Sequence, residues 1–268
     1  SLEPSFLFES KIRKALLSQY GLEIIERVEK IFSDSSPIDL SIKSSASEEN
    51  YFKQLKGTSV NRSHFRLSQK TSLIKTKGYC AGDWWVQSLA ASLPVKIAPM
   101  DLKEKIVLDV CCAPGGKSFQ LADKGAILTS IDKSERRLKL MKENLDRLNY
   151  DLDLICKDVF EYQPKNLFDI ILLDPPCTAT GTIGKNPDLQ FLNPLDKLEE
   201  LSDIQQKMLK RCASWLQDDG YIIYSVCSLL KEEGEDQISR FLKKNKEFCL
   251  IHPKKKGYLD QEGYETNK

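Results

Sequence analysis

The 268-residue sequence has little of what a metal centre or a membrane protein needs. It contains two histidines, His64 and His252, and none of its eight cysteines forms a C-x-x-C pair, so no zinc site is expected. No apolar run approaches the length of about 18 residues that suggests a transmembrane helix. The N-terminal stretch SLEPSFLFES lacks the basic start and apolar core of a secretory signal. We therefore expect a cytoplasmic protein with reduced thiols, without a membrane segment and without a metal.

Positive and negative side chains nearly balance, with 40 Lys and Arg against 39 Asp and Glu. The net charge therefore says nothing about a nucleic-acid partner. Residues 50–82 nevertheless contain no Asp or Glu, and aromatic residues are interleaved there with basic ones: Tyr51, Phe52, Lys53, Lys56, Arg62, Phe65, Arg66, Lys70, Lys75, Lys77 and Tyr79. Basic side chains can neutralise phosphates, and aromatic rings can stack on unpaired bases. An RNA-binding segment and an ordinary solvated surface both fit this pattern.

The chain after residue 101 alternates between apolar runs and amphipathic segments. Strands are predicted at 105–110, 126–132, 152–158, 168–174 and 220–228. Helices are predicted from the Gly-rich turn to about residue 123, and at 134–148, 196–216 and 231–245. Strands that alternate with helices predict an α/β fold with a mostly parallel sheet.

The first hundred residues predict a smaller α/β region. Apolar spacing indicates a helical pair over 9–32, and alternation indicates a short strand over 38–43. The stretch DWWVQSLAASLP (83–94) predicts a helix that Asp83 caps and Pro94 ends.

A Gly-rich turn, DVCCAPGGKS (109–118), joins the first parallel strand to its helix. Such turns bring the backbone and the helix N-terminus close to a ligand. A phosphate-binding P-loop would need Gly at the position of Cys111, and the complete G-x-G-x-x-G of a dinucleotide fold is also absent. A lone Gly-Gly turn is therefore a weak signal for either.

Aspartates stand at or near the ends of four predicted strands: Asp109, Asp132, Asp158 and Asp174. Any one of them could simply cap a helix. Because ligands of open α/β sheets bind beyond the carboxyl ends of the strands, four carboxylates beside a Gly-rich turn indicate a ligand crevice. Asp132 is placed to accept hydrogen bonds from ribose hydroxyls. The pattern fits a nucleoside joined to an amino acid, as in S-adenosylmethionine, better than a dinucleotide.

Two cysteines stand at the predicted carboxyl ends of neighbouring strands, Cys177 in LLDPPCTATG and Cys227 in YSVCSL. We expect both thiols to lie beside Asp174. The reaction that needs a thiolate and a methyl donor is methylation of a pyrimidine at carbon 5, because that carbon becomes nucleophilic only after a group adds to carbon 6. A second group must then remove the proton from carbon 5. The pattern alone does not decide which thiol is the nucleophile.

Five stretches occur in an order that carries a resemblance: DVCCAPGGKS, SIDKSERRL, KDVF, LLDPPCTATG and YSVCSLLKEEGE. Together with GDWWVQSLAA they resemble the motifs of the RNA cytosine-5 methyltransferases, in particular the bacterial Sun/Fmu-type ribosomal RNA branch, over residues 78–245. The resemblance implies a Rossmann-like, S-adenosylmethionine-dependent methyltransferase core over 78–268, preceded by a linking, RNA-binding region over 1–77. It also implies an RNA substrate, 16S ribosomal RNA in the first place, and we expect a monomer.

The resemblance also implies roles for individual residues. Cys227 would be the nucleophile, Cys177 would assist release of the product, and Asp174 would lie between cofactor and base. The cofactor would be bound by Cys111, Cys112, Ala113, Pro114, Gly115, Gly116, Lys117, Asp132 at the ribose, Asp158 at the adenine, and Asp174.

Two positions depart from the family pattern: Val226 stands where Thr is usual, and Ser88 where an acidic residue is usual. Lys185 and Asn186, in the loop after Cys177, either approach the substrate or are plain solvated loop residues. Three alternatives stay open, namely a tRNA enzyme, an inactive RNA-binding relative and, opposed by Cys111, a P-loop nucleotide hydrolase.

Overall fold

The computed structural model describes residues 8–34, 37–46, 55–61, 63–68 and 72–251. The chain divides into two compact units. The sheet unit comprises Pro37–Asp174, Cys212–Tyr224 and Ile251–Lys268, and the helical unit comprises Ser1–Ser36, Pro175–Arg211 and Ser225–Leu250. The predicted boundary at residues 77/78 remains a prediction. Several residues of the basic, aromatic segment lie outside the described residues: Tyr51, Phe52, Lys53, Arg62 and Lys70.

A five-stranded parallel sheet forms the centre of the sheet unit, in the order β7-β6-β5-β8-β9. Its strands are β5 (Ile106–Val110), β6 (Ile127–Asp132), β7 (Asp153–Cys156), β8 (Phe168–Leu173) and β9 (Leu216–Tyr224). Val107, Leu108 and Val110 of the central strand are completely buried, as expected for a parallel strand covered on both faces. The predicted α/β fold with a parallel sheet is confirmed.

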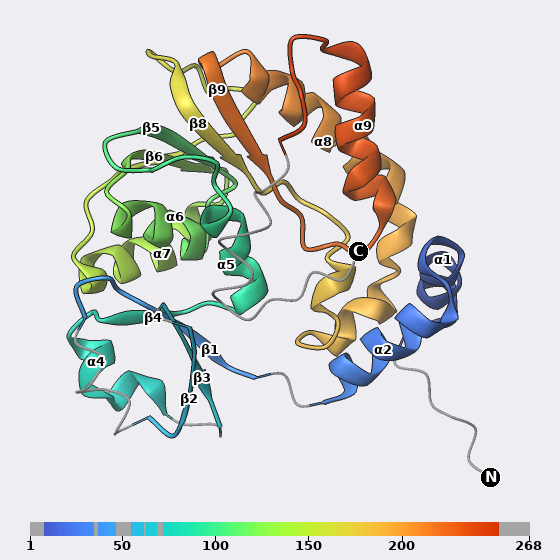
Figure 1. Ribbon diagram of the computed structural model, residues 1–268, viewed down its shortest axis with the longest axis horizontal. Helices are drawn as coiled ribbons and strands as arrows, with labels where there is room; N and C mark the ends of the chain where they lie inside the picture. The colour runs from blue at the N-terminus through green and yellow to red at the C-terminus, as the bar shows by residue number, and fades with distance from the viewer. Residues whose placement is uncertain (1–7, 35–36, 47–54, 62, 69–71, 252–268) are drawn as a thin grey trace. The chain divides into compact units, whose positions relative to one another are not determined.

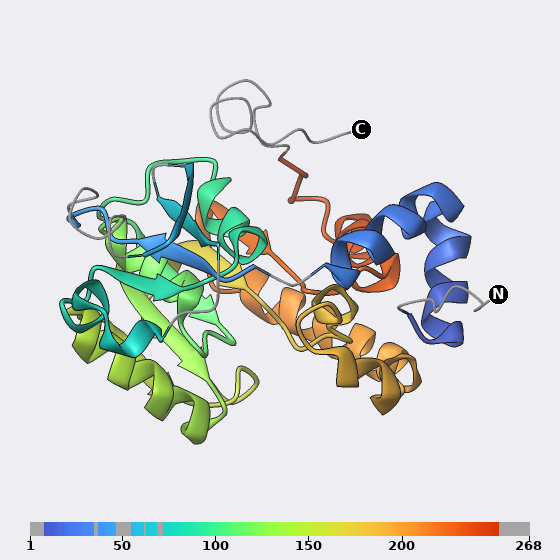
Figure 2. The same cartoon turned by 90° about the horizontal axis from the view of Figure 1, so that it is seen from below.

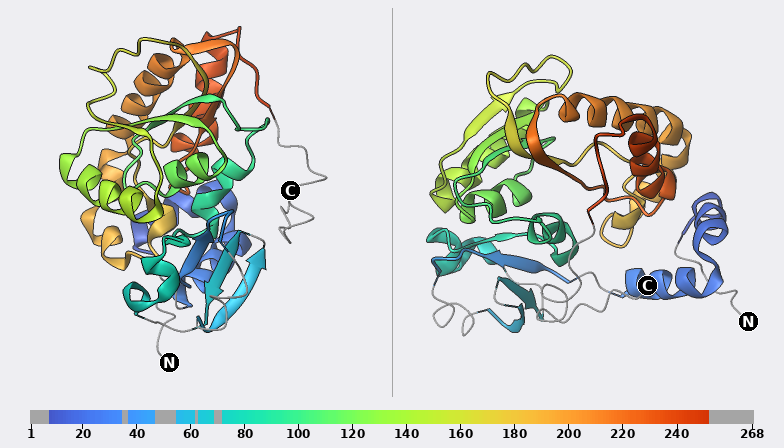
Figure 3. Two further views of the ribbon diagram at one scale, coloured as in Figure 1. Left: turned by 90° about the vertical axis from the view of Figure 1, so that its left-hand side faces the viewer. Right: turned by 45° about the horizontal axis from the view of Figure 1, so that its top comes forward.

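Helices α6 (Gly116–Asp123) and α7 (Glu135–Leu148) lie between the parallel sheet and a second, smaller sheet (Figures 1 and 3). Ser134 caps α7 by accepting a hydrogen bond from the Arg137 backbone N–H at 3.4 Å. Met141 and Leu148 of α7 are fully buried in a cluster that also contains Phe119 of α6. These two helices therefore carry the core that joins the two sheets.

The smaller sheet is antiparallel, in the order β2-β3-β1-β4. Its strands are β1 (Asp39–Ile42), β2 (Gly57–Asn61), β3 (His64–Leu67) and β4 (Trp84–Val86), and the short helix α4 (Lys77–Cys80) precedes β4. The ring of Trp85 packs edge-on against Phe119 and Tyr150. The predicted strand at 38–43 is thus confirmed, and β4 attaches the small sheet to the helices.

The sequence predicted a helix over 83–94, and both of these bounds are wrong. Trp84 and Trp85 are both buried, which an extended backbone achieves by placing one ring on each face of the sheet. Helix α5 (Leu89–Lys96) begins only after Ser88, whose hydroxyl accepts from the Ala91 backbone N–H, and it continues through Pro94. Ser88 is therefore the cap of this helix, and Pro94 is an internal residue.

The helical unit contains α1 (Ser10–Tyr20), α2 (Leu22–Ser33), α9 (Glu235–Lys244) and most of α8 (Leu198–Ala213). Figure 2 shows α1 and α2 as a helical pair that meets at Gly21, which confirms the pair predicted over 9–32. Ile12, Leu16 and Ile25 pack with Ile183 and Leu230. Within the described part of the chain, no helix combines the length and apolarity needed to cross a membrane.

Candidate active site

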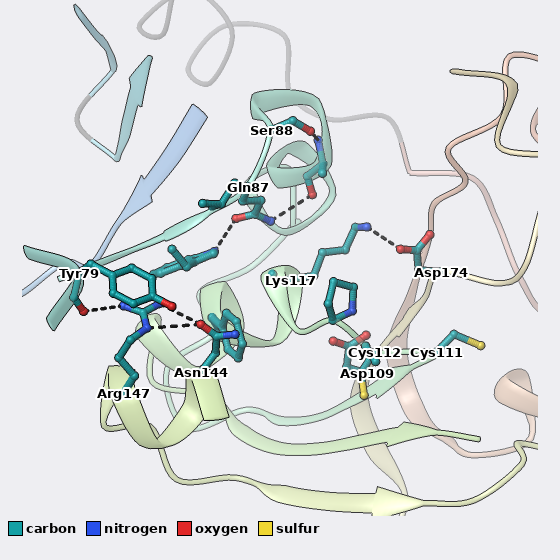
Figure 4. A pocket seen from close by; sticks show the side chains of 17 residues that line it. Tyr79, Gln87, Ser88, Asp109, Cys111, Cys112, Lys117, Asn144, Arg147 and Asp174 are labelled. Atoms are coloured by element: carbon teal, nitrogen blue, oxygen red, sulfur yellow. Dashed lines mark hydrogen bonds and ion pairs between the residues drawn. The ribbon is translucent and has the colours of Figure 1, made fainter. Parts of the chain in front are cut away.

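A pocket of about 400 Å³ lies at the carboxyl end of β5 in the sheet unit (Figure 4). That volume falls within the range of small-molecule sites, roughly 300–1,000 Å³. Its lining combines the loop after β5 and the start of α6 with residues of β4, α5 and α7. The lining residues are Tyr79, Trp85, Val86, Gln87, Ser88, Ala91, Asp109, Cys111, Cys112, Ala113, Pro114, Gly116, Lys117, Phe119, Asn144, Arg147 and Asp174.

The loop from Cys111 to Gly115 needs an unusual backbone. Cys111 and Gly115 have φ values of 62° and 107°. A Cβ atom at Gly115 would lie 2.4 Å from Cζ of Phe119, so only glycine fits there. The tight loop leads directly into α6, whose first backbone N–H groups lack partners within the helix. The pocket therefore has a rim of backbone donors beside the helix N-terminus, which favours a polar or anionic ligand group.

Asp109 lies under this loop with 1 % of its surface exposed. Burial raises the pKa of its carboxyl group to about 7, although the hydroxyl of Ser118, which donates to it at 2.5 Å, and the charge of Lys117 oppose that shift. Near neutral pH a large share of Asp109 thus carries a proton. A neutral carboxyl group can both donate and accept a hydrogen bond on the pocket floor.

Lys117 and Asp174 form an ion pair on the wall of the same pocket, with Nζ 2.6 Å from Oδ2 (Figure 4). Lys117 comes from the first turn of α6, and Asp174 directly follows β8. The Asp174 backbone N–H donates to the Val110 carbonyl, which extends the pairing of β8 with β5 by one residue. The pocket therefore offers a carboxylate and an ammonium group side by side.

Three predicted cofactor residues do not line the pocket: Gly115, Asp132 and Asp158. Asp132, at the end of β6, is buried, and its carboxylate accepts from the backbone N–H groups of Ala113 and Ser134 and lies 3.3 Å from Arg137. Asp132 thus holds the Gly-rich loop in place from behind. Asp158 lies two residues beyond β7 and accepts from the Phe160 backbone N–H. The predicted contacts of these two aspartates with ribose and adenine remain predictions.

The structure adds pocket residues from β4, from the segment directly after it, and from α7. Gln87 accepts hydrogen bonds from Trp85 Nε1 and Ser41 and donates one to Gln120. Arg147 donates to the Tyr79 and Trp84 carbonyls, and its guanidinium lies over the Tyr79 ring (Figure 4). If the stretch WWVQ had been predicted as a strand, Trp85 and Gln87 would have been placed on one face. No sequence pattern of this kind indicates that Arg147 lines the pocket.

The helical unit brings the two predicted catalytic thiols together. Sγ of Cys177 lies 3.4 Å from Sγ of Cys227, well beyond the disulfide bond length of about 2.05 Å. Cys227 stands three residues after β9, so the expectation that it ends that strand is wrong: the strand stops at Tyr224, and a loop carries the thiol. The backbone N–H of Gly181 donates to the Cys227 carbonyl at 2.9 Å, which joins the two loops.

The four cysteines of the motifs differ in their environment. The hydrogen bond with Cys227, followed by burial, raises the pKa of the Cys177 thiol, so Cys177 is protonated at neutral pH. Cys227 is exposed. Burial, followed by the charges of nearby aspartates, raises the pKa of Cys111 to about 12, and burial also raises that of Cys112. Cys111 and Cys112 therefore shape the pocket as neutral side chains, and Cys227 is the accessible thiol.

Comparison with protein families gives one model, described as 16S rRNA methyltransferase RsmB/F, that matches residues 96–266. Among curated proteins, a ribosomal RNA small subunit methyltransferase B of Shewanella oneidensis is 39% identical over 143 residues, covering 52% of this chain and 33% of that protein. The protein of that name from Pseudomonas syringae is 34% identical over 215 residues, covering 68% of this chain and 48% of its own length. The chain thus spans less than half the length of these relatives.

Solved structures share the fold. A methyltransferase homolog protein from Pyrococcus horikoshii superposes with a TM-score of 0.74 at 26% identity, covering 90% of this chain and 83% of the other. The structure of NSun6 from the same organism, solved with SFG, gives a TM-score of 0.79 at 17% identity, covering 90% and 88%. These similarities confirm the Rossmann-like methyltransferase fold.

Proposed function

Because the chain belongs to the 16S rRNA methyltransferase RsmB/F family, we propose that it transfers a methyl group from S-adenosylmethionine to carbon 5 of a cytosine in 16S ribosomal RNA, through a covalent bond between Cys227 and the base. The observation that carries the proposal is the pair of thiols 3.4 Å apart. A methyltransferase acting on an amino group has no use for two adjacent thiols, whereas methylation at carbon 5 needs one group to add and another to remove a proton.

The proposed cofactor site is the pocket of the sheet unit. S-Adenosylmethionine is a nucleoside joined to an amino acid, so its binding needs donors for a carboxylate and acceptors for ribose hydroxyls. The N-terminus of α6 supplies donors, and Cys111 to Lys117 form a cradle in which a side chain at Gly115 would clash. Asp132 would accept from the ribose, and Asp158 would face the adenine. When bound, the cofactor supplies an electrophilic methyl group.

The exposed Cys227 is the better nucleophile of the pair. A thiolate is strongly nucleophilic at neutral pH, and addition of the Cys227 sulfur to carbon 6 makes carbon 5 electron-rich. The hydrogen bond with Cys227 is the largest cause of the raised pKa of Cys177. When the Cys227 sulfur bonds to carbon, this interaction weakens, and Cys177 can more easily exist as a thiolate. Once carbon 5 carries the methyl group, Cys177 would accept the proton from carbon 5, and Cys227 would leave.

Asp174 and Lys117 would assist at the nitrogen side of the base. Addition at carbon 6 places negative charge on the ring, and a proton delivered to N3 neutralises it. The Lys117 ammonium group would supply this proton, which would pass through the Asp174 carboxylate to N3 and return by the same route. Asp174 and Cys177 are three residues apart in the chain, so their Cα atoms lie within about 11 Å by covalent geometry alone. The proposal requires one base to meet both groups.

The test is transfer of labelled methyl groups to 16S ribosomal RNA that lacks 5-methylcytosine, with tRNA in a parallel assay. We expect Cys227→Ser to abolish transfer and Cys177→Ser to accumulate an RNA–protein adduct that survives denaturation. Cys249→Ser, which changes an exposed cysteine of the same unit, is the control and should behave like the wild type. The roles are refuted if Cys177→Ser gives no adduct while Cys227→Ser still methylates. Methyl transfer to tRNA alone would support the proposed reaction and show that tRNA, and not 16S ribosomal RNA, is the substrate.

A further inference from the structure

We propose that Glu233 is a positioning residue that holds the Cys177 and Cys227 thiols at their reacting distance. The proposal rests on the proposed function, in which both thiols act on one base. Glu233 does not need to touch the RNA for this. It acts through the residue that follows each cysteine.

Glu233 is a completely buried carboxylate, with 0 % of its surface exposed. It accepts a hydrogen bond from the Thr178 backbone N–H at 2.9 Å and another from the Thr178 hydroxyl. Gln205 Nε2 donates to it at 3.0 Å and also to the Pro176 carbonyl at 2.9 Å. Cys177 is therefore held on both sides, because the residues before and after it are tied to one carboxylate and one amide.

The connection continues to the other thiol through Ser228. The Ser228 hydroxyl lies 3.0 Å from that of Thr178 and 3.2 Å from that of Thr180. Thr180 in turn accepts from the Leu229 backbone N–H at 2.9 Å. The residue that follows Cys227 is thus joined directly to the residue that follows Cys177, and Glu233 stands at the end of this chain.

The hydroxyl of Thr178 gives the chain a direction. It donates its single proton to Glu233. The oxygen of Thr178 is then left to accept from Ser228. Both oxygens of Glu233 also face the Thr178 N–H, at 2.9 and 3.2 Å. An amide at this position would therefore point an NH₂ group at existing donors, and the contact would be lost or displaced.

Accuracy of placement matters here because each thiol must reach a different carbon of one ring. A displacement of about 1 Å can cost roughly a hundredfold in rate when it affects reacting atoms. Burying a carboxylate is unfavourable unless hydrogen bonds compensate for the lost water. Three donors from the thiol loop and α8 compensate the buried Glu233 and fix the geometry of the loop.

The experiment compares Glu233→Gln with Glu232→Gln, the same change at the neighbouring residue, whose carboxylate accepts from Gln19. The reduced, RNA-free protein is treated with diamide. This diazene takes up the two electrons and two protons that the thiols lose as Cys177 and Cys227 form a disulfide, and mass spectrometry follows the bond. We expect Glu233→Gln to slow closure by roughly tenfold, and Glu232→Gln to leave it unchanged.

A second readout is methyl transfer itself. Glu233→Gln should lower kcat and leave the KM for RNA unchanged, because the thiols are misplaced and the RNA surface is not. Closure at the wild-type rate in Glu233→Gln overturns the proposal. If that variant does not fold, the proposal is tested with Ser228→Ala, because loss of the Ser228 hydroxyl should also slow disulfide closure. A wild-type protein without methyl transfer would refute the proposed function, and the disulfide measurement would still decide the role of Glu233.

Discussion

The proposed cofactor pocket and the thiol pair are built by different means. The pocket stands on regular structure, since its loop, Asp109 and Asp174 lie at the ends of β5 and β8 and at the start of α6. The thiols lie in irregular loops of the helical unit, and hydrogen bonds among hydroxyl groups and to one carboxylate hold these loops. The first site depends on backbone geometry and the second on side chains.

This difference teaches which substitutions each site tolerates. A backbone-built pocket is sensitive where the chain needs glycine, and it is less sensitive to the identity of Cys111 or Ala113. A site built from side chains loses its geometry when one hydroxyl or carboxylate is removed, although the fold around it survives. Substitutions that affect one site and spare the other can therefore test the contrast.

The largest effect is expected for Gly115→Ala in the pocket. The new Cβ would lie 2.4 Å from Phe119 and 2.9 Å from Met141, at a φ of 107°. Strain and overpacking together should lower the free energy of unfolding by about 2–5 kcal/mol, as measured by urea denaturation. Gly116→Ala is the control, because its Cβ would make only ordinary contacts at 3.4 Å with Gln87. Equal losses in the two variants would contradict the backbone argument.

A smaller effect, about 4 kcal/mol at most, is expected for Asp109→Asn. The carboxyl pKa of Asp109 is raised to about 7 in the folded protein and returns near 4 on unfolding. Between these values the folded state binds a proton that the unfolded state releases, so stability falls as pH rises from about 4 to 7. Asn cannot ionise and should remove that slope.

The measurement is the urea midpoint of wild type and Asp109→Asn between pH 4 and pH 8. As pH rises, the urea midpoint of the variant should increase relative to that of the wild type. Above pH 7 the difference between the two midpoints should stay constant. Asp101→Asn, at an exposed carboxylate, should run parallel to the wild type. Parallel curves for Asp109→Asn as well would show that the buried carboxyl group is not the source of the slope.

The smallest change in stability, about 1 kcal/mol, is expected for Gly181→Ala beside the thiols. Its Cβ would lie 2.9 Å from the Cys227 carbonyl oxygen, so the Cys227 loop must shift. Disulfide closure between Cys177 and Cys227 should slow several-fold, while S-adenosylmethionine binding, measured by calorimetry, stays unchanged. In Gly116→Ala, S-adenosylmethionine binding should weaken and disulfide closure should keep its wild-type rate, because the substitution changes the pocket and leaves the thiol loops intact. A loss of both properties in either variant would show that the two sites are not independent.

The sequence predicts the pocket better than it predicts the thiol pair. Apolar runs identify β5 to β8 because a parallel strand buried on both faces carries few polar residues, and the Gly-rich turn and Asp174 follow from those strands. The tandem Trp84–Trp85 misled the prediction, since two adjacent large rings fit a helix as well as a strand. The 3.4 Å between Sγ atoms depends on Thr178, Ser228 and Glu233, whose cooperation across 55 residues leaves no periodic signal.

Gln87 has a consequence for the energetics of ligand capture. Through it, Ser41 of β1 is linked to Gln120 of α6, and Gln120 donates in turn to the Ser92 carbonyl in α5. The neighbouring His64 remains uncharged because burial lowers its pKa to about 4, so this network does not change with physiological pH. The hydrogen-bonded side chains on this side of the pocket therefore lose little conformational entropy when a ligand binds. A ligand therefore meets a preorganised wall, and little of its binding free energy is consumed in ordering the protein.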